Sequence, residues 1–188
     1  MVEALVTRFR ERIRREPTVD YTGQEPPIRP RPPLTPEVLA AAEARLGFSL
    51  PPLLRALYTQ IGDGGYGPGR GLEVLAEGEW SLVAHVEAVR QCDWPDWPGW
   101  PGQFIPLIAW GCLYVSWVDC SAPPYSVWFD DTDCDVVGAA RDDYFYLQAD
   151  SLECWLSAWL DGVDLWAAGK RAPRHAAPGT SPSTSFAQ

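Results

Sequence analysis

A glycine-rich segment with the sequence GDGGYGPGRG has the composition of a phosphate-binding loop. Its residues Gly62, Gly64 and Gly67 have the G-x-G-x-x-G spacing of dinucleotide-binding proteins. In those proteins the glycines let the backbone approach a pyrophosphate, which binds at the N-terminus of the helix that follows. That chemistry requires a strand before the glycines and a helix after them.

The residues around this segment predict neither element in the required place. A helical pattern precedes the segment and ends at Ile61, whereas residues 71–76 predict a short strand after it. The Pro-Gly pair at 68–69 would interrupt a helix where the phosphate needs an N-terminus. We therefore predict a turn in which Gly62 caps the preceding helix and the Gly64–Gly65 pair adopts positive φ.

The segment DDTDCD at residues 130–135 is the best candidate for a metal site, because clustered carboxylates repel one another and attract a cation. Its residues Asp131, Asp133 and Asp135 match the first three ligand positions of a D-x-D-x-D calcium loop. The match then fails, since Val136 replaces the glycine of the turn and Asp142 replaces the bidentate glutamate. We interpret the cluster as a solvated acidic turn without a metal; a looser divalent-cation site is the alternative.

Nucleophilic or acid–base catalysis has few candidate residues in this chain. The two histidines are His85, in a predicted helix, and His175, near the C-terminal end. They do not supply the nucleophile, base and orienting residue of a catalytic set, and the chain has no G-x-S-x-G motif. Cys112 and Cys120 fall on predicted strands, where we expect packed thiols. We therefore predict a protein that is not an enzyme and has no cofactor.

The charge of the chain predicts a basic protein partner. The formal net charge is −10, and residues 91–165 contain thirteen acidic residues and one basic residue. Nucleic-acid binding is excluded, because it needs Lys and Arg side chains that displace counterions from phosphates. The five cysteines include no C-x-x-C pair, and neither a signal peptide nor a membrane-spanning stretch is recognisable. These features predict a reduced, cytoplasmic protein outside the membrane.

Three tryptophans repeat every third residue in the segment WPDWPGWP, at Trp94, Trp97 and Trp100. Polyproline II has three residues per turn, so this spacing would place the three rings along one edge. The favoured interpretation is a loop that lays these rings over the core, because exposed tryptophans promote aggregation. The alternative is an exposed ridge that anchors a partner.

Residues 1–16 have the spacing of an amphipathic helix with an arginine-rich outer face, and the apolar positions are Val2, Leu5, Val6, Phe9 and Ile13. We favour docking of this helix on the domain, because glutamates interrupt the basic face; an anionic membrane is the alternative partner. A Pro-rich linker is predicted at residues 17–35. Residues 169–188, rich in Ala, Pro, Ser and Thr, predict a disordered tail.

Residues 36–168 predict a single α+β domain. Helices are expected after Thr35, from Pro51-Pro52, over residues 81–91 and after Ser151, with Gly47 ending the first. Strands rich in β-branched and aromatic residues are expected at 104–110, 113–118, 125–129 and 144–147. Helices followed by a run of strands and a final helix predict an antiparallel or mixed sheet of about five to six strands, flanked by N- and C-terminal helices.

Several short motifs, taken in order, resemble the SUKH superfamily of small α+β domains. They are LAAAEARLG at 39–47, LP at 50–51, the Gly64–Gly65 turn, FIPL at 104–107, WGC at 110–112, VDCS at 118–121 and SLECWLSAWLDG at 151–162. The turn has Asp63 where the family more often has asparagine, and aspartate also tolerates turn geometry. The resemblance covers roughly residues 36–166.

The resemblance implies a binding module without catalytic residues, since many members neutralise a toxin, often a nuclease or deaminase, by occluding its active site. We therefore expect a cytoplasmic immunity protein whose toxin presents a basic surface. The expected contact residues are Asp130, Asp131, Asp133, Asp135, Asp142, Asp143, Trp94, Trp97 and Trp100. The alternatives are a regulatory or scaffold module with several partners, and a domain that binds a small ligand or a divalent cation.

Overall fold

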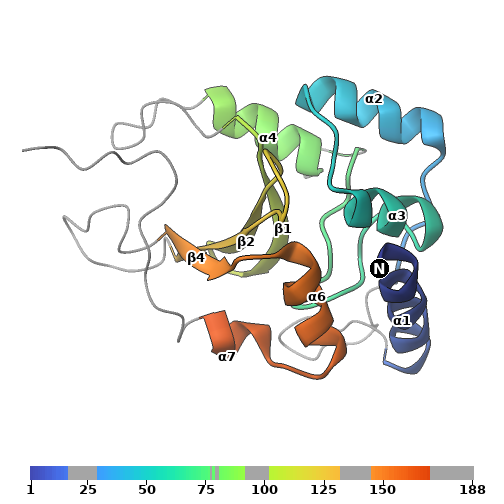
Figure 1. Ribbon diagram of the computed structural model, residues 1–188. Coiled ribbons are helices and arrows are strands. Elements are labelled where there is room, and N and C mark those ends of the chain that lie inside the picture. The colour runs from blue at the N-terminus through green and yellow to red at the C-terminus, as the bar shows by residue number, and fades with distance from the viewer. Residues whose placement is uncertain (17–28, 77, 79–80, 92–101, 132–144, 170–188) are drawn as a thin grey trace, which may run out of the picture.

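The computed structural model describes residues 1–16, 29–76, 78, 81–91, 102–131 and 145–169. Over these residues the elements are α1 (Val2–Arg15), α2 (Pro36–Leu46), α3 (Pro52–Gln60), α4 (Leu82–Gln91), β1 (Phe104–Gly111), β2 (Tyr114–Asp119), β3 (Val127–Asp131), β4 (Phe145–Ala149), α6 (Leu152–Leu160) and α7 (Leu165–Gly169). One sheet packs with helices from both ends of the chain, which confirms the predicted α+β class (Figure 1).

The helix boundaries follow the capping residues that the sequence predicts. The Thr35 hydroxyl accepts a hydrogen bond from the Val38 amide at 3.4 Å, and Gly47 ends the same helix, α2, with a φ of 84°. At the start of α6, the Ser151 hydroxyl accepts a hydrogen bond from the Cys154 amide at 3.3 Å. Each hydroxyl satisfies an amide that the first turn of a helix leaves without an intrahelical partner.

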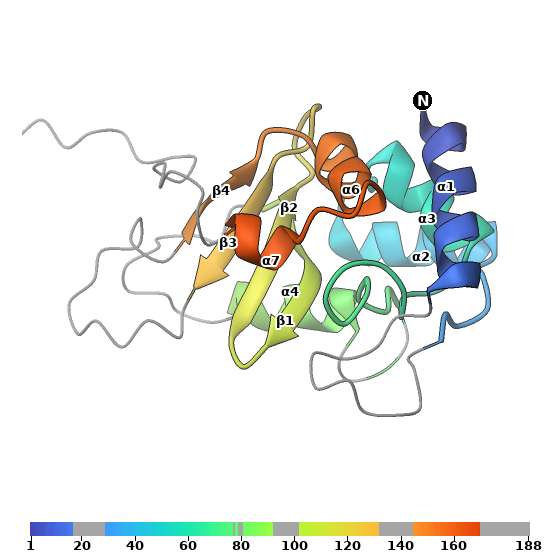
Figure 2. The same cartoon turned by 90° about the horizontal axis from the view of Figure 1, so that it is seen from below.

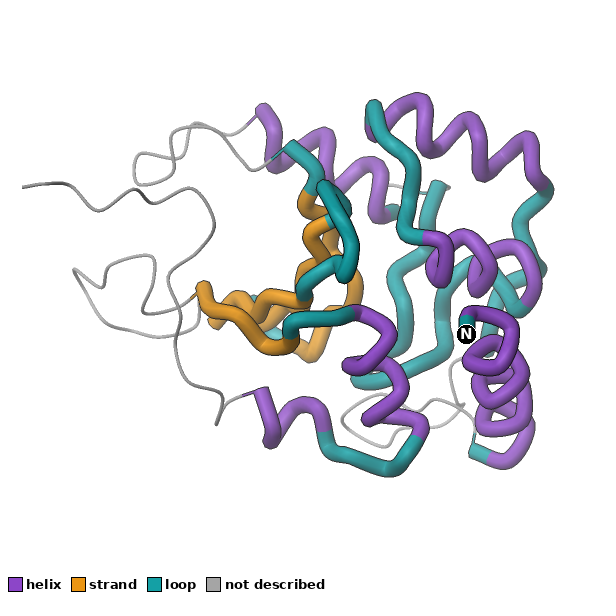
Figure 3. The backbone as a smooth tube through the Cα atoms, viewed as in Figure 1, coloured by secondary structure: helices purple, strands orange, loops and turns teal. Residues whose placement is uncertain are grey.

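The strands form an antiparallel sheet in the order β1-β2-β3-β4, so each strand pairs with its neighbour in sequence. Figure 3 shows the strands gathered in orange between the helices. The strand predicted at residues 71–76 is wrong, because this segment makes one isolated bridge, between Leu72 and Ile108. Gly71 has a φ of 88°, which departs from the extended conformation that a ladder requires. The described sheet therefore has four strands, fewer than the five to six expected.

Alternation along the strands gives the sheet two apolar faces. The larger face contributes Ile105, Val118 and Val127 to the main core, which residues of α1, α2, α3, α4 and α6 complete. Figures 1 and 2 show α1, α2 and α3 together on one side of the sheet. The other face carries a smaller cluster, made by Val89, Phe104, Trp117, Trp128 and Phe145.

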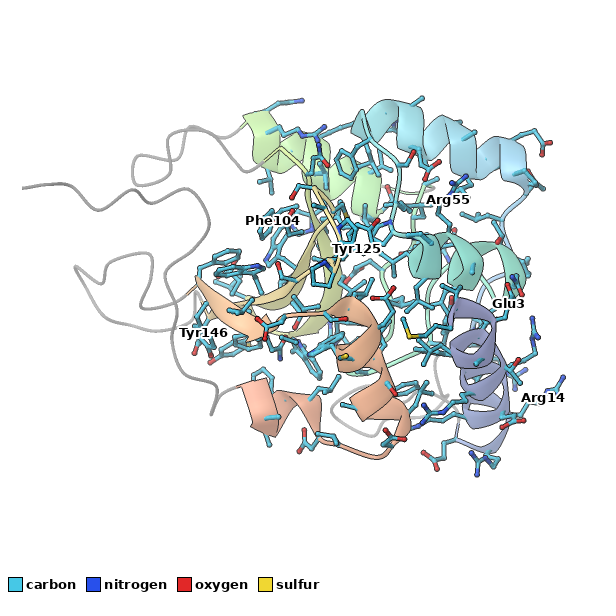
Figure 4. The ribbon with its side chains drawn as sticks, in the orientation of Figure 1. Glu3, Arg14, Arg55, Phe104, Tyr125 and Tyr146 are labelled. Carbon is cyan, nitrogen blue, oxygen red and sulfur yellow. The ribbon has the colours of Figure 1, made fainter. Side chains whose placement is uncertain are left out.

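The N-terminal helix α1 docks on the domain. Its side chains Leu5, Val6 and Phe9 are buried in the main core. Towards α6, Arg8 forms an ion pair with Asp161, and the Arg12 guanidinium carbon lies 4.0 Å from the centroid of the Trp159 ring. Arg14 is exposed on the outer side of the helix (Figure 4). The apolar stripe of α1 is thus covered by the chain itself, as the favoured interpretation required.

We expect Phe9→Ala to lower the free energy of unfolding by about 3–5 kcal/mol, because the ring is fully buried and its removal leaves a cavity. Glu11→Ala changes an exposed position on the same helix and should alter stability by less than about 0.5 kcal/mol. Urea unfolding followed by tryptophan fluorescence measures both variants. Equal stabilities of the two variants would contradict the packing of α1 into the core.

Candidate functional site

The glycine-rich segment forms a tight loop after α3. Gly64 and Gly65 have φ values of 74° and 77°, which confirms the predicted turn. The helix is capped by Ile61, in the right-handed region, and not by Gly62. Gly62 is required for a different reason, because a Cβ at this position would lie 2.4 Å from the carbonyl oxygen of Arg31.

The buried Asp63 ties this loop to two other parts of the chain. Its amide donates to the carbonyl oxygens of Arg31 and Pro32, at 3.3 and 3.2 Å. Its side-chain Oδ1 accepts a hydrogen bond from the Leu75 amide at 2.7 Å. The segment before α2 and the segment after the loop are therefore joined through one residue.

Two buried tyrosines reinforce the same region. The Tyr58 hydroxyl donates to the Glu73 carbonyl at 2.8 Å, and the Tyr66 hydroxyl donates to the Gly62 carbonyl at 3.2 Å. Burial raises the pKa of both hydroxyls well above the usual value, so both stay protonated and act as donors.

The loop engages its amides in internal hydrogen bonds that a phosphate would have to break. The amides of Gly65, Leu72 and Gly71 donate to the carbonyl oxygens of Leu72, Tyr66 and Pro68, at 2.9, 2.8 and 2.8 Å respectively. The next helix along the chain, α4, begins at Leu82, eleven residues beyond Gly71. The G-x-G-x-x-G spacing therefore serves a structural turn.

A groove with a volume of about 770 Å³ lies between this loop, α4 and the smaller face of the sheet. Arg29 and Arg31, from the segment before α2, line it together with Arg70 from the loop. Gly69 lets the loop approach β1 so closely that a Cβ there would lie 2.9 Å from Ile108 and from Trp110. Arginines far apart in sequence thereby line the same groove.

The rest of the groove combines apolar and titratable side chains. Leu72, Val89, Ala109, Val115 and Trp117 contribute apolar surface. The His85 ring lies 5.3 Å from the Trp117 ring, and burial lowers its pKa, which favours neutral imidazole at pH 7. Burial also raises the pKa of Glu73, against the opposing effects of a hydrogen bond with the Ala109 backbone and of the Arg70 charge. The groove can therefore bind both apolar and ionic groups.

The two described aspartates of the predicted contact surface point to opposite faces of the sheet. Asp130 pairs with Val115 and lines the groove, on the smaller face. Asp131 pairs with Tyr114, whose ring stacks on Phe129 on the larger face. Successive strand residues alternate in direction, so these neighbouring carboxylates cannot act on one flat surface.

The other predicted contact residues lie outside the described residues, in the segments 92–101 and 132–144. These are Trp94, Trp97, Trp100, Asp133, Asp135, Asp142 and Asp143.

The described residues that flank these two segments lie at opposite ends of the sheet. Segment 132–144 leaves β3 and enters β4 where Asp130 pairs with Phe145, at the end of the sheet that holds the β1–β2 hairpin. Segment 92–101 joins α4 to β1 at the opposite end of the sheet, where Phe104 pairs with Asp119. A strand residue rises about 3.3 Å, so the length of β1 separates these ends by roughly 20 Å.

The cysteines divide between surface and core. The expectation that Cys112 is packed is wrong, because it is exposed in the hairpin between β1 and β2 with a φ of 47°. Cys120 is buried as expected, and burial raises the pKa of its thiol. Within the described residues, no group of three His, Cys, Asp or Glu side chains is placed to hold a metal ion. In the same part of the chain, every helix is too short or too polar to cross a membrane.

Sequence reasoning missed the groove. It assigned Arg29 and Arg31 to a linker, whereas the structure holds this segment against the domain through Asp63 and through a hydrogen bond from the Leu34 amide to the Tyr58 carbonyl, 2.9 Å long. The available signal was weak: three arginines in Pro- and Gly-rich segments of an acidic chain.

Comparison with known proteins identifies the domain. The model of the SMI1 / KNR4 family (SUKH-1) matches residues 33–158, about two thirds of the chain. The match begins just before α2 and ends within α6, so it spans the loop, the whole sheet and the groove apart from Arg29 and Arg31. Comparisons with curated proteins and with solved structures give no significant match.

We expect Asp63→Ala to lower the free energy of unfolding by about 1–3 kcal/mol, because the Leu75 amide then loses its acceptor in a buried site. Asp63→Asn keeps a side-chain oxygen at the same position and should cost less. Chemical denaturation of the two variants measures the difference. Equal losses would show that the charge of Asp63, and not its role as an acceptor, stabilises the loop.

Proposed function

The chain belongs to the SMI1 / KNR4 family (SUKH-1), and on that basis we propose that it is an immunity protein that neutralises a cognate toxin by binding over the toxin's active site. The family is known for immunity and interaction domains and is generally non-catalytic. This membership is the observation that carries the proposal. The protein would act as a stoichiometric inhibitor in the cytoplasm of the cell that makes the toxin.

The charge of the chain supports a partner with a basic surface. A net charge of −10, concentrated in residues 91–165, complements the basic cleft that a nuclease needs for binding phosphates. Complementary charge accelerates association and excludes acidic proteins. We therefore propose a nuclease-like toxin.

The contact surface that we propose begins at the hairpin end of the sheet. Asp131 is followed by the acidic segment 132–144, which contains four more aspartates. This segment connects β3 to β4, and both strands meet it at the hairpin end of the sheet. The tryptophans of segment 92–101, which joins the sheet at its opposite end, would supply apolar anchors in a second part of the interface, since aromatic residues dominate binding energy in many interfaces.

A second candidate function is that of a regulatory or scaffold module with several partners. The groove favours it, because a groove with both arginines and apolar residues offers a binding surface that differs in charge from the acidic segment. The two candidates differ in the number of partners and in the response of binding to salt.

Affinity capture of the tagged protein from its own cells, with elution by rising salt and identification by mass spectrometry, tests the proposal. We expect one stoichiometric partner that carries a basic domain and is released only at high salt. Several weakly held partners would favour the scaffold function. Failure to capture any partner would contradict the immunity proposal.

Neutralising Asp131, Asp133 and Asp135 together, each as Asp→Asn, should weaken binding of the captured partner about tenfold at low salt, mainly through slower association. The control variant, Glu11→Gln, Glu16→Gln and Asp150→Asn, removes three charges from exposed positions on α1, at its C-cap and just after β4. Surface plasmon resonance measures the rates, and thermal unfolding checks the fold. Unchanged affinity in the first variant, or equal weakening in both, would reject the acidic contact surface.

A further inference from the structure

We propose that the groove between the glycine-rich loop, α4 and the sheet binds an extended acidic peptide segment with an apolar side chain at its centre. The carboxylates of this segment would lie along Arg29, Arg31 and Arg70, and its apolar side chain would lie over Val115 and Trp117. This inference goes beyond the proposed function, which concerns a basic partner and the acidic segment.

The first argument is local charge. The titratable side chains that line the groove are Arg29, Arg31, Arg70, Glu73, His85, Asp130 and Cys112. Arginines outnumber carboxylates in this set, whereas the chain as a whole carries a net charge of −10. Guanidinium groups hold carboxylates through paired, charge-assisted hydrogen bonds, so the groove complements an acidic ligand although the protein as a whole is acidic.

The second argument is shape and polarity. A volume of about 770 Å³ is within the range of sites that enclose small ligands or a few peptide residues. The floor presents apolar atoms of Ala109, Val115 and Trp117, and the exposed Leu113, at 62% of its full accessibility, stands at the hairpin. An apolar side chain removed from water over this floor contributes the affinity that exposed ion pairs alone do not supply.

The third argument is that the arginines are positioned before any ligand arrives. The Asp63 amide holds the Arg31 carbonyl, and the contact of Gly69 with β1 fixes the loop beside Arg70. The Arg70 amide also donates to the Ala109 carbonyl at 3.4 Å. Backbones that are held in place reduce the entropy lost when the side chains engage a ligand.

Fluorescence anisotropy with the labelled peptide Asp-Glu-Phe-Asp-Glu and the full-length protein tests this inference. We expect saturable binding that weakens with salt, as exposed ionic contacts require. The double variant Arg29→Glu, Arg31→Glu should weaken binding at least about tenfold, because it places carboxylates where the peptide needs guanidinium groups. The control variant Arg14→Glu, Arg15→Glu makes the same charge change on the exposed side of α1 and should bind like the unchanged protein.

Two further peptides separate charge from apolar contact. Replacing Phe by Gly should weaken binding, and replacing the acidic residues by lysines should abolish it. Absence of acidic-peptide binding at about millimolar protein, which corresponds to less than about 4 kcal/mol, would overturn the inference. Equal binding of the peptide by both arginine variants would also overturn the inference. So would analytical sedimentation showing a dimer that only the Arg29→Glu, Arg31→Glu variant dissociates, because the groove would then bind a second copy of the chain. Because the assay contains no toxin, failure to bind the peptide leaves the immunity proposal standing. Failure to capture a toxin likewise leaves the peptide-binding inference standing.

Discussion

The hydrogen bonds of Asp63 hold together parts of the chain that the rest of the structure depends on. Through its amide and its carboxylate, this buried residue joins the segment before α2, the glycine-rich loop and the backbone at Leu75. Glycines at 62 and 64 make this possible, since a Cβ at either position would overlap neighbouring backbone atoms. The hydrogen bonds of Asp63 therefore hold in place both the loop that forms one wall of the groove and the backbone beside the buried Leu75.

The domain extends beyond the segment that the family model matches. Helix α1 lies before residue 33, yet its apolar side chains enter the main core and its arginines contact α6. An amphipathic helix gains most of its stability from burial of its apolar stripe, and α6 supplies part of that burial here. The first helix of the chain is therefore structural, and its basic outer side is the part left for solvent.

The sheet separates side chains that are neighbours in the sequence. Asp130 and Asp131 are neighbours in the chain, but strand geometry directs the first to the groove and the second to the larger face. The acidic and the tryptophan-rich segments join the sheet at opposite ends. Asp131 and the arginine-lined groove therefore lie on opposite faces of the sheet.

The amino-acid sequence by itself determined the class of the fold, the caps of α2 and α6 and the positive-φ turn at Gly64 and Gly65, but not the cap of α3. Those features depend on interactions within a few residues, such as the hydroxyls of Thr35 and Ser151 that cap α2 and α6. Only the tertiary structure decided that residues 71–76 form no strand and that Arg29, Arg31 and Arg70 line one groove. Contacts between distant segments leave no periodic signal in a single sequence, because they arise from a buried aspartate and from close backbone approaches that local propensity does not record.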